Sequence, residues 1–484
     1  MTATTELQSP TLVDEQLRLF GVDREVIRRT LSTALERGAD HADLYFQHRS
    51  GRSIGLEDGI VSRASTSVDR GVGVRVVVGD QTGYAYSERL EPEAMRNAAR
   101  TAAAIADGGS AVAPQALEAA THPLLYPLER GLDQVPALEK LPLVRQVEAL
   151  ARAASPEVEK VSVSWVDADD RVLIATSDGR LHADDRPMTR LSLSVTTNRN
   201  GERQSNSSSL AGRRGIEWYD AERLEAFVKD LVERTLILYE ARRPPAGEMP
   251  VVLAAGASGI LLHEAVGHGM EADFARKGMT IYSDQIGEQV APPEVTIVDS
   301  ALHPNERGAL AVDDEGNATE RTVLVENGVM SSFIHDSISA RHYGVTPTGS
   351  GRRESFRHVP MPRMRCTYME NGPRSFEEIV AAVDNGIVAE NFQNGQVQIG
   401  AGDFTFFVKN GWLIEGGKVT APIKDVNIIG NGPKAIRDIS LVADDLKLDT
   451  GGWTCGKEGQ SVPVSQGMPS VLVSKLTVGG SAGE

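Results

Sequence analysis

Apolar side chains in the first part of the chain follow two different periods. Residues from about 23 to 37 carry them at helical spacing, and the segments around ADLYFQ, SIGLEDG and GVGVRVVVGDQTGYAY alternate like strands that end at Gly and Asp turns. A second helix is predicted from about Glu91 to Ala106, with Pro92 in its first turn. The pattern predicts a lobe in which helices pack on an antiparallel sheet.

The same order of elements recurs after a Pro-containing linker. A helix over about 141–154, strands over about 159–199 and a helix over about 220–241 are predicted there. The string ARRPPAGEMP (241–250) concentrates Pro and Gly before a new apolar run, so the main domain boundary is predicted at this point. The expected organisation is a flexible N-terminus (1–20), an α+β lobe (21–112), a linker (113–136), a second α+β lobe (137–242) and a third domain (243–484).

Short β-type runs dominate the third domain, apart from one helix. Two hairpins are predicted from their turn residues. The first, TVLVENGVMSSFI, turns at Asn327-Gly328. The second, FTFFVKNGWLIEGGKVT, turns at Asn410-Gly411 and again near 416–417. The expected fold class is therefore α+β, with two helix-plus-antiparallel-sheet lobes followed by a β-rich, barrel-like domain.

Charge and cysteine content narrow the class of protein. The chain has 67 acidic and 50 basic residues, and a net charge of −17 would repel a phosphate backbone, so direct nucleic-acid binding is not expected. The chain shows neither a secretory signal nor an apolar run of roughly 18 to 20 residues that could span a bilayer, so we expect a cytoplasmic protein with no membrane contact. With Cys366 and Cys455 as the only cysteines, a disulfide framework is implausible.

The string LLHEAVGHGMEAD carries the first candidate chemistry. His263 is followed at once by Glu264 and five positions later by His268. This is similar to the HExxH signature, in which two imidazoles bind zinc and the glutamate takes a proton from the metal-bound water. An i,i+5 pair lies about 140° apart on a regular helix, so a π-bulge or local unwinding is predicted at Gly267. The alternative is two ordinary histidines on a partly buried helix.

A catalytic zinc normally takes three protein ligands. Glu271 would complete a local site, whereas Cys455 lies far downstream in GGWTCGKEGQSVP. Cys455 is favoured because the glycines around it let the backbone approach a metal, and because Lys457 would hold the sulfur as thiolate. The alternatives are a buried structural thiol for Cys455 and a solvated carboxylate for Glu271.

Eight strings together resemble the TldD/PmbA family over nearly the whole chain. They are GASGILLHEAVGHGMEAD (256–273), AVDDEGNATERTVLVENG (311–328), PTGSGRRES (347–355), MPRMRCTYM (361–369), GDFTF (402–406), IGNGP (429–433), LDTGGWTCGKEGQSVPV (448–464) and LTVGG (476–480). The resemblance implies zinc ligands at His263, His268 and Cys455, with Glu264 as the catalytic acid/base. It also implies the metallopeptidase branch, because the non-catalytic branch lacks the HExxxH string and the matching cysteine.

The resemblance further implies a substrate and a partner. We expect a zinc metallopeptidase that hydrolyses peptide bonds in unstructured peptides or flexible segments, using Zn²⁺-bound water activated by Glu264. The expected assembly is a hetero-oligomer with a non-catalytic TldE/PmbA-type homologue, or a homodimer. The alternatives are a non-catalytic peptide-binding subunit of a hetero-oligomer, or another zinc amidase with the same ligands.

Several residues keep open roles. Cys366 stands where the family pattern leads us to expect Asn or a similar polar residue, and a neutral substitution is the favoured interpretation. Arg352, Arg353 and His358 are possible oxyanion-stabilising groups. The acidic string VDDEGN (312–317) lacks the ligand spacing of a calcium loop, so a turn or a solvated face is predicted there.

Overall fold

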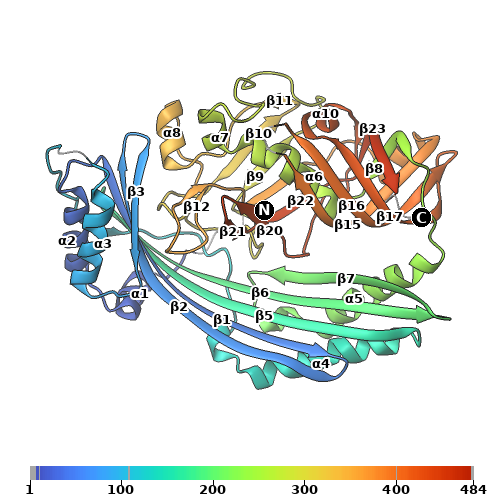
Figure 1. Cartoon of the computed structure of the whole chain (residues 1–484), viewed down its shortest axis with the longest axis horizontal. Coiled ribbons are helices and arrows are strands. Elements are labelled where there is room, and N and C mark those ends of the chain that lie inside the picture. The colour runs from blue at the N-terminus through green and yellow to red at the C-terminus, as the bar shows by residue number, and fades with distance from the viewer. Residues whose placement is uncertain (1–6, 10, 107–108, 399–400, 481–484) are drawn as a thin grey trace.

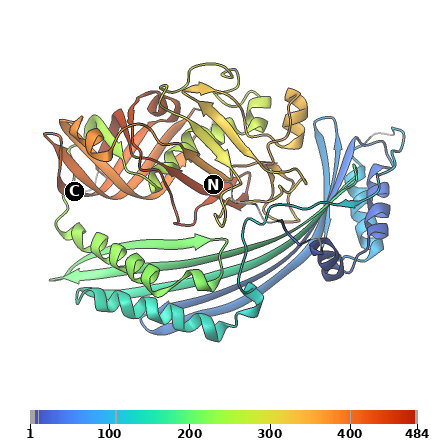
Figure 2. The ribbon, with the colours of Figure 1, turned by 180° about the vertical axis from the view of Figure 1, so that it is seen from behind.

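The computed structural model describes residues 7–9, 11–106, 109–398 and 401–480. A long curved sheet with helices on its outer side forms one part of the molecule, and the C-terminal half forms a second body that faces the inner side of this sheet (Figures 1 and 2). The predicted α+β class, with a β-rich and barrel-like C-terminal domain, is confirmed.

The two predicted N-terminal lobes share one sheet. Its strand order is β3-β2-β1-β5-β6-β4, and β7 pairs with β6. Strand β1 of the first lobe runs antiparallel to β5 of the second from the pair Asp43–Thr176 to the pair Glu57–Ser162. The bounds are β1 His41–Glu57, β2 Ile60–Val78, β3 Gln81–Ser87, β4 Glu118–Ala119, β5 Val158–Thr176, β6 Arg180–Arg199 and β7 Glu202–Gly212.

Helices cover the outer side of this sheet in two groups, which follow the repeated order of the sequence (Figure 2). The first group is α1 Leu12–Phe20, α2 Arg24–Leu35 and α3 Pro92–Ala103. The second comprises η1 Leu132–Gln134, α4 Ala137–Ala154, η2 Ile216–Trp218, α5 Ala221–Leu236 and η3 Ile237–Tyr239. Each group buries its apolar stripe in a separate core against the sheet.

The start of the chain differs from its expected flexibility. Residues 12–20 form helix α1, which buries Val13, Leu17 and Phe20. These positions are spaced by three and four, so one face of the helix joins the core of the first group. The other residues of the predicted flexible segment lie partly outside the described residues.

The C-terminal half contains a closed five-stranded barrel. Strands β8, β15, β16, β17 and β23 form the ring, because β17 pairs with both β16 and β23. Strand β18 adds to β23 outside the ring. The bounds are β8 Gly247–Leu253, β15 Asn385–Val397, β16 Asp403–Glu415, β17 Lys418–Asn431, β18 Ile439–Val442 and β23 Val471–Gly480.

A second sheet, of order β11-β10-β9-β14-β22-β19, packs beside the barrel. It consists of β9 Ile297–Ser300, β10 Arg321–Glu326, β11 Val329–Met330, β14 Cys366–Met369, β19 Lys447–Leu448 and β22 Ser465–Met468. Two small hairpins pair β12 Gly351–Arg352 with β13 Met361–Pro362, and β20 Thr454–Lys457 with β21 Gln460–Pro463. The domain's short helices are η4 Ala257–Gly259, α6 Ile260–Leu262, η5 His263–Gly267, η6 His268–Met270, α7 Ala272–Arg276, α8 Ser337–Tyr343, α9 Phe376–Ala381 and α10 Gly432–Arg437.

One of the three predicted hairpin turns inside this domain is wrong. Asn327 and Gly328 form the predicted turn between β10 and β11, both with positive φ. Asn410 instead lies inside β16, where its side chain is buried, accepts a hydrogen bond from Asn206 and donates one to the Arg234 carbonyl. Burial of these paired polar groups keeps the strand continuous until the predicted glycine turn at 416–417.

Candidate metal centre

The HExxxH segment departs from a regular α-helix at the predicted place. Residues His263–Gly267 form a single π-helical turn, and the backbone N–H of His268 donates to the His263 carbonyl, five residues back. A Cβ at Gly267 would overlap the sulfur of Met364, so a larger residue here would require that side chain to move. The predicted π-bulge is confirmed, and the wider turn brings the two imidazoles to the same side of the helix.

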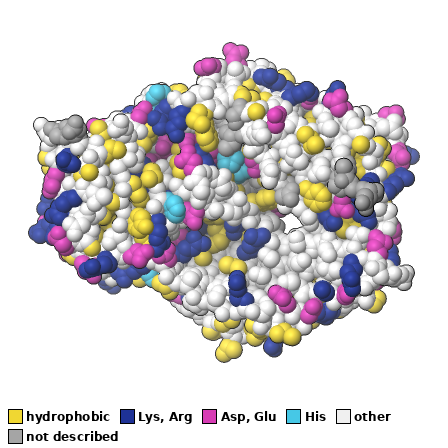
Figure 3. All heavy atoms as spheres, viewed as in Figure 1, with side chains coloured by type: hydrophobic (Ala, Val, Ile, Leu, Met, Phe, Trp, Pro, Cys, Tyr) yellow, Lys and Arg dark blue, Asp and Glu magenta, His cyan; other side chains and the backbone are white. Residues whose placement is uncertain are grey.

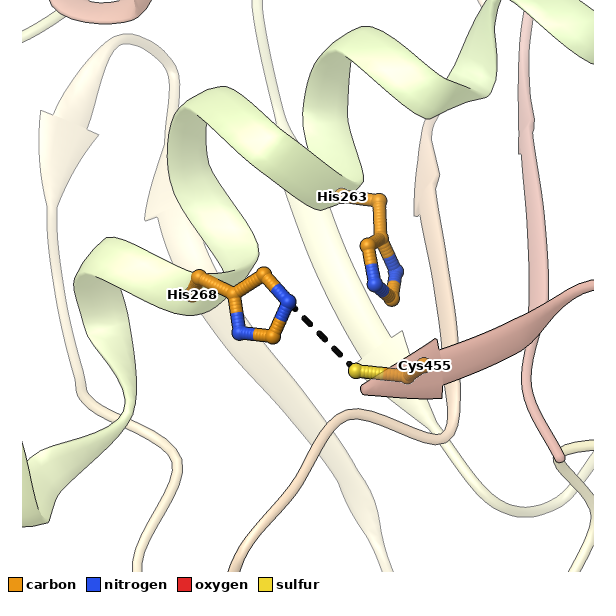
Figure 4. A group of neighbouring side chains, drawn as sticks. All are labelled: His263, His268 and Cys455. Carbon is orange, nitrogen blue, oxygen red and sulfur yellow. Dashed lines mark hydrogen bonds between the residues drawn. The ribbon is translucent and has the colours of Figure 1, made fainter. Parts of the chain in front are cut away.

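His263, His268 and Cys455 come together in the interior (Figure 4). One ligand atom from each lies within 4.8 Å of the others, and all three side chains are buried. The Cys455 sulfur lies 3.4 Å from His268 Nε2, and the two imidazole centroids are 5.0 Å apart. Cys455 enters from β20, whose position is fixed by a 2.6 Å hydrogen bond from Arg363 to the Cys455 carbonyl.

The chemistry of these donor atoms fits a soft or borderline divalent metal such as zinc. Burial alone would raise the pKa of Cys455, but the charge and hydrogen bonds of His263 and His268 outweigh it and hold the pKa well below its usual value. His263 Nδ1 is buried without a hydrogen-bond partner in the structure.

Glu271, the alternative third ligand in the sequence analysis, contacts the ring nitrogen of His268 that does not face Cys455. Its Oε2 accepts a hydrogen bond from His268 Nδ1 at 3.0 Å, so His268 Nε2 is left facing Cys455. Lys457 Nζ lies 3.1 Å from the same carboxylate and 2.7 Å from Asp273. Lys457 therefore pairs with these carboxylates and not with the Cys455 sulfur. A carboxylate in this position fixes the orientation of a metal-binding imidazole.

Glu264 lies on the wall of a cavity of about 390 Å³ that also reaches His263, His268 and Cys455. Trp453, on the loop before β20, forms another part of this wall. Burial raises the pKa of Glu264, although the neighbouring histidines oppose the shift. A carboxylate with a raised pKa in a cavity is suited to proton transfer.

The remaining sequence candidates lie outside this cavity. Arg352 and Arg353 line a neighbouring cavity, and His358 exchanges a 2.9 Å hydrogen bond with Ser355. Their suggested role at an oxyanion stays a prediction. Cys366 is a free, fully buried thiol in β14, and burial strongly raises its pKa.

Sequence reasoning missed the environment of the acidic string 312–317. Asp313, Asp314 and Glu315 form a turn, as predicted, but they are buried rather than solvated. Glu315 Oε1 lies 2.5 Å from Arg75 of the N-terminal sheet, and Asp314 Oδ1 lies 2.5 Å from Arg186. We call this cluster, with Asp43 and Arg353, the arginine–carboxylate network. In the sequence, the only indication of this network is the run of acidic residues within a short string.

Three family sequence profiles match the chain in order. They describe PmbA/TldA metallopeptidase domain 1 over residues 42–106, the central domain over 130–239 and the C-terminal domain over 246–480. A curated Haemophilus influenzae protein named metalloprotease TldD homolog is 43% identical over 452 residues, which cover 92% of this chain and 94% of that protein.

Solved structures share the fold. A Thermotoga maritima protein, solved as a proposed modulator of a DNA gyrase, aligns with a TM-score of 0.77 at 24% identity, over 94% of this chain and 99% of that one. TldE from Thermococcus kodakarensis aligns with a TM-score of 0.73 at 20% identity, over 94% of this chain and 100% of that one.

Within the described part of the chain, the helices are too short or too polar to cross a membrane.

Proposed function

Because this chain belongs to the PmbA/TldD metallopeptidase family, we propose that it is a zinc peptidase that hydrolyses peptide bonds in unstructured peptides or flexible segments. The observation that carries the proposal is the convergence of His263, His268 and Cys455 beside Glu264 in one cavity. These three side chains are the proposed zinc ligands, and Glu264 is the proposed catalytic acid/base.

The metal and three side chains have separate roles in the proposed reaction. Zinc at this site supplies Lewis acidity, which polarises a carbonyl and makes water a stronger nucleophile near neutral pH. Glu264 accepts a proton from the attacking water and passes it to the leaving amine. Glu271 holds His268 in the orientation that presents Nε2, and Lys457 balances the charge of Glu271.

The surroundings of the site support the proposed substrate. The cavity lies in the interior, so a flexible segment reaches it more readily than a folded domain does. We propose an assembly with a non-catalytic homologue of the TldE/PmbA type, or a homodimer.

The proposal is tested by metal content and peptide cleavage in the same preparations. Elemental analysis of the purified wild type should give about one zinc per chain, a ratio set by one three-ligand site. Glu264→Ala should keep the zinc and lose about 10²–10⁴-fold in cleavage rate of a flexible peptide, because it removes only the acid/base group. Cys455→Ser should lose both metal and cleavage, because the thiolate ligand is gone.

The matched control is Cys366→Ala, which removes the other buried thiol and should leave metal content and cleavage unchanged. Normal metal binding by Cys455→Ser would contradict the ligand assignment. A wild type that holds metal and binds peptides without cleaving them would favour the alternative of a non-catalytic binding subunit.

A further inference from the structure

A second cavity, of about 380 Å³, is rich in arginine although the chain as a whole is strongly acidic. It lies between the N-terminal sheet and the C-terminal body. Arg49 of β1 and Arg190 of β6 are exposed, whereas Arg213, Arg307 and Arg352 are buried in its wall. Figure 3 shows this side of the molecule, with basic side chains along the boundary between its two parts.

The arginines of this cavity differ in how they are paired. Arg186 and Arg353 belong to the arginine–carboxylate network and contact carboxylates directly. Within the described residues, Arg213, Arg307 and Arg352 form no ion pair. Their partners are the carbonyls, one hydroxyl and one aromatic ring that surround them.

An unpaired buried cation costs free energy. Burial and nearby arginines lower the pKa of Arg352 to about 9 and that of Arg307 to about 10. Both values lie above neutrality, so both guanidinium groups are charged at pH 7. Arg213 Nε is also buried without a hydrogen-bond partner. The wall of the cavity therefore carries buried positive charge that an anion would offset, and its arginines outnumber the acidic residues Asp170, Asp314 and Glu354 in the same wall.

This second cavity meets the candidate metal centre at one residue. Thr454, which immediately precedes Cys455 in β20, lines both cavities. Arg307 donates to the Thr454 hydroxyl and to the Trp453 carbonyl, at 3.3 Å in each case, and both residues also form the wall beside the metal ligands. A ligand in the second cavity is thus adjacent to a peptide at the metal centre.

We infer that the arginine-lined cavity binds a carboxylate of the peptide substrate, presented by its C-terminus or by an acidic side chain. Guanidinium groups bind carboxylates through paired, charge-assisted hydrogen bonds. Apolar side chains in the same wall, among them Met188, Leu310 and Val462, offer contacts to the carbon chain that carries the carboxylate. The inference rests on the proposed function, which places a peptide at the metal centre.

The experiment compares four short flexible peptides that carry an uncharged fluorophore at the N-terminus. One has a free C-terminus, one is amidated, and two are amidated with either Glu or Gln in the middle. Binding is measured by fluorescence anisotropy with Glu264→Ala protein, so that the peptides stay intact. At least one carboxylate peptide should bind about tenfold more tightly than its neutral counterpart, the size expected for one charge-assisted contact. The pair that differs identifies which carboxylate is recognised.

Variants then test whether arginines of the cavity cause the tighter binding of carboxylate peptides. Arg307→Gln and Arg49→Gln should each reduce it, and Arg49 is a useful second site because its exposed side chain makes no ion pair within the described residues. The matched control is Arg63→Gln, which removes an exposed arginine of the same sheet outside the cavity and should keep the full preference. Thermal denaturation checks that each variant is folded.

Equal binding of charged and neutral peptides would overturn the inference, and so would a preference that survives in both cavity variants. Cleavage of the neutral amidated peptide by the wild type separates this result from the proposed function. Cleavage without a carboxylate preference refutes the cavity assignment alone. A preference without any cleavage refutes the peptidase assignment alone.

Discussion

The candidate metal centre and the arginine–carboxylate network are both clusters of buried charged groups, but they satisfy those groups differently. In the network, Arg75 lies 2.6 Å from Asp43 and 2.5 Å from Glu315, and Arg186 contacts two carboxylates in the same way. At the metal centre, His263 Nδ1 has no hydrogen-bond partner, and the Cys455 sulfur lies close to two imidazoles.

This difference distinguishes charged groups that stabilise the fold from charged groups that are available to bind a ligand. The network joins the N-terminal sheet to the C-terminal body, because Asp43 and Arg75 come from β1 and β2 while Glu315 comes from the other part. Burial alone would raise the pKa of Asp43, but Arg75 and Arg353 outweigh it and hold the pKa below its usual value. Paired groups of this kind stabilise one arrangement, whereas unpaired donors are available to a ligand.

The largest expected change in stability comes from breaking the network. Arg75→Met leaves Asp43 and Glu315 buried without this guanidinium, so the free energy of unfolding should fall by about 3–5 kcal/mol. Denaturant unfolding monitored by circular dichroism measures the change. Protein that remains folded should still bind one equivalent of metal. If the variant is as stable as the wild type, the network does not stabilise the contact between the N-terminal sheet and the C-terminal body.

A smaller effect, confined to the metal centre, is expected for Glu271→Gln. The amide keeps an acceptor for His268 Nδ1 but removes the charge, so metal affinity should fall about 10–100-fold, as for other partners of metal-binding imidazoles. Competition with a chelator of known affinity measures this. Complete loss of metal would instead make Glu271 a ligand, and unchanged affinity would remove its orienting role.

The smallest effect is expected at an exposed pair with similar geometry. Arg203 contacts both Glu159 carboxylate oxygens, at 2.7 and 2.8 Å, on the surface of the N-terminal sheet. Solvent screens such a pair, so Arg203→Gln should leave the melting temperature unchanged within error. A loss of stability as large as that of Arg75→Met would mean that the geometry of an ion pair, and not its burial, determines how much it stabilises the protein.

The local part of the site could be predicted from the sequence. His263 and His268 stand five residues apart with Gly267 between them, and that spacing alone requires the wider turn. The glycine neighbours of Cys455 and the family resemblance favour this residue as the third ligand. The partner of Lys457 could not be predicted, because its carboxylates approach from the HExxxH segment in the folded state only.

The same limit applies to the fold. Helical and strand periods predicted most elements of the N-terminal half, but no local signal shows that β1 pairs with β5 and merges two lobes into one sheet. The burial of Glu315 depends on Arg75, which lies 240 residues away along the chain. Asn410-Gly411 has the residues of a turn, yet tertiary hydrogen bonds hold it inside a strand.

The wide separation of the three converging side chains has a consequence for protein synthesis. Cys455 follows His268 by 187 residues, and the last strand of the barrel, β23, comes later still. A nascent chain on the ribosome therefore exposes the histidine pair long before the cysteine has been translated. On the proposed assignment, hydrolysis begins only after Cys455 has been translated, so a translation product truncated before Cys455 is not an active protease in the cell.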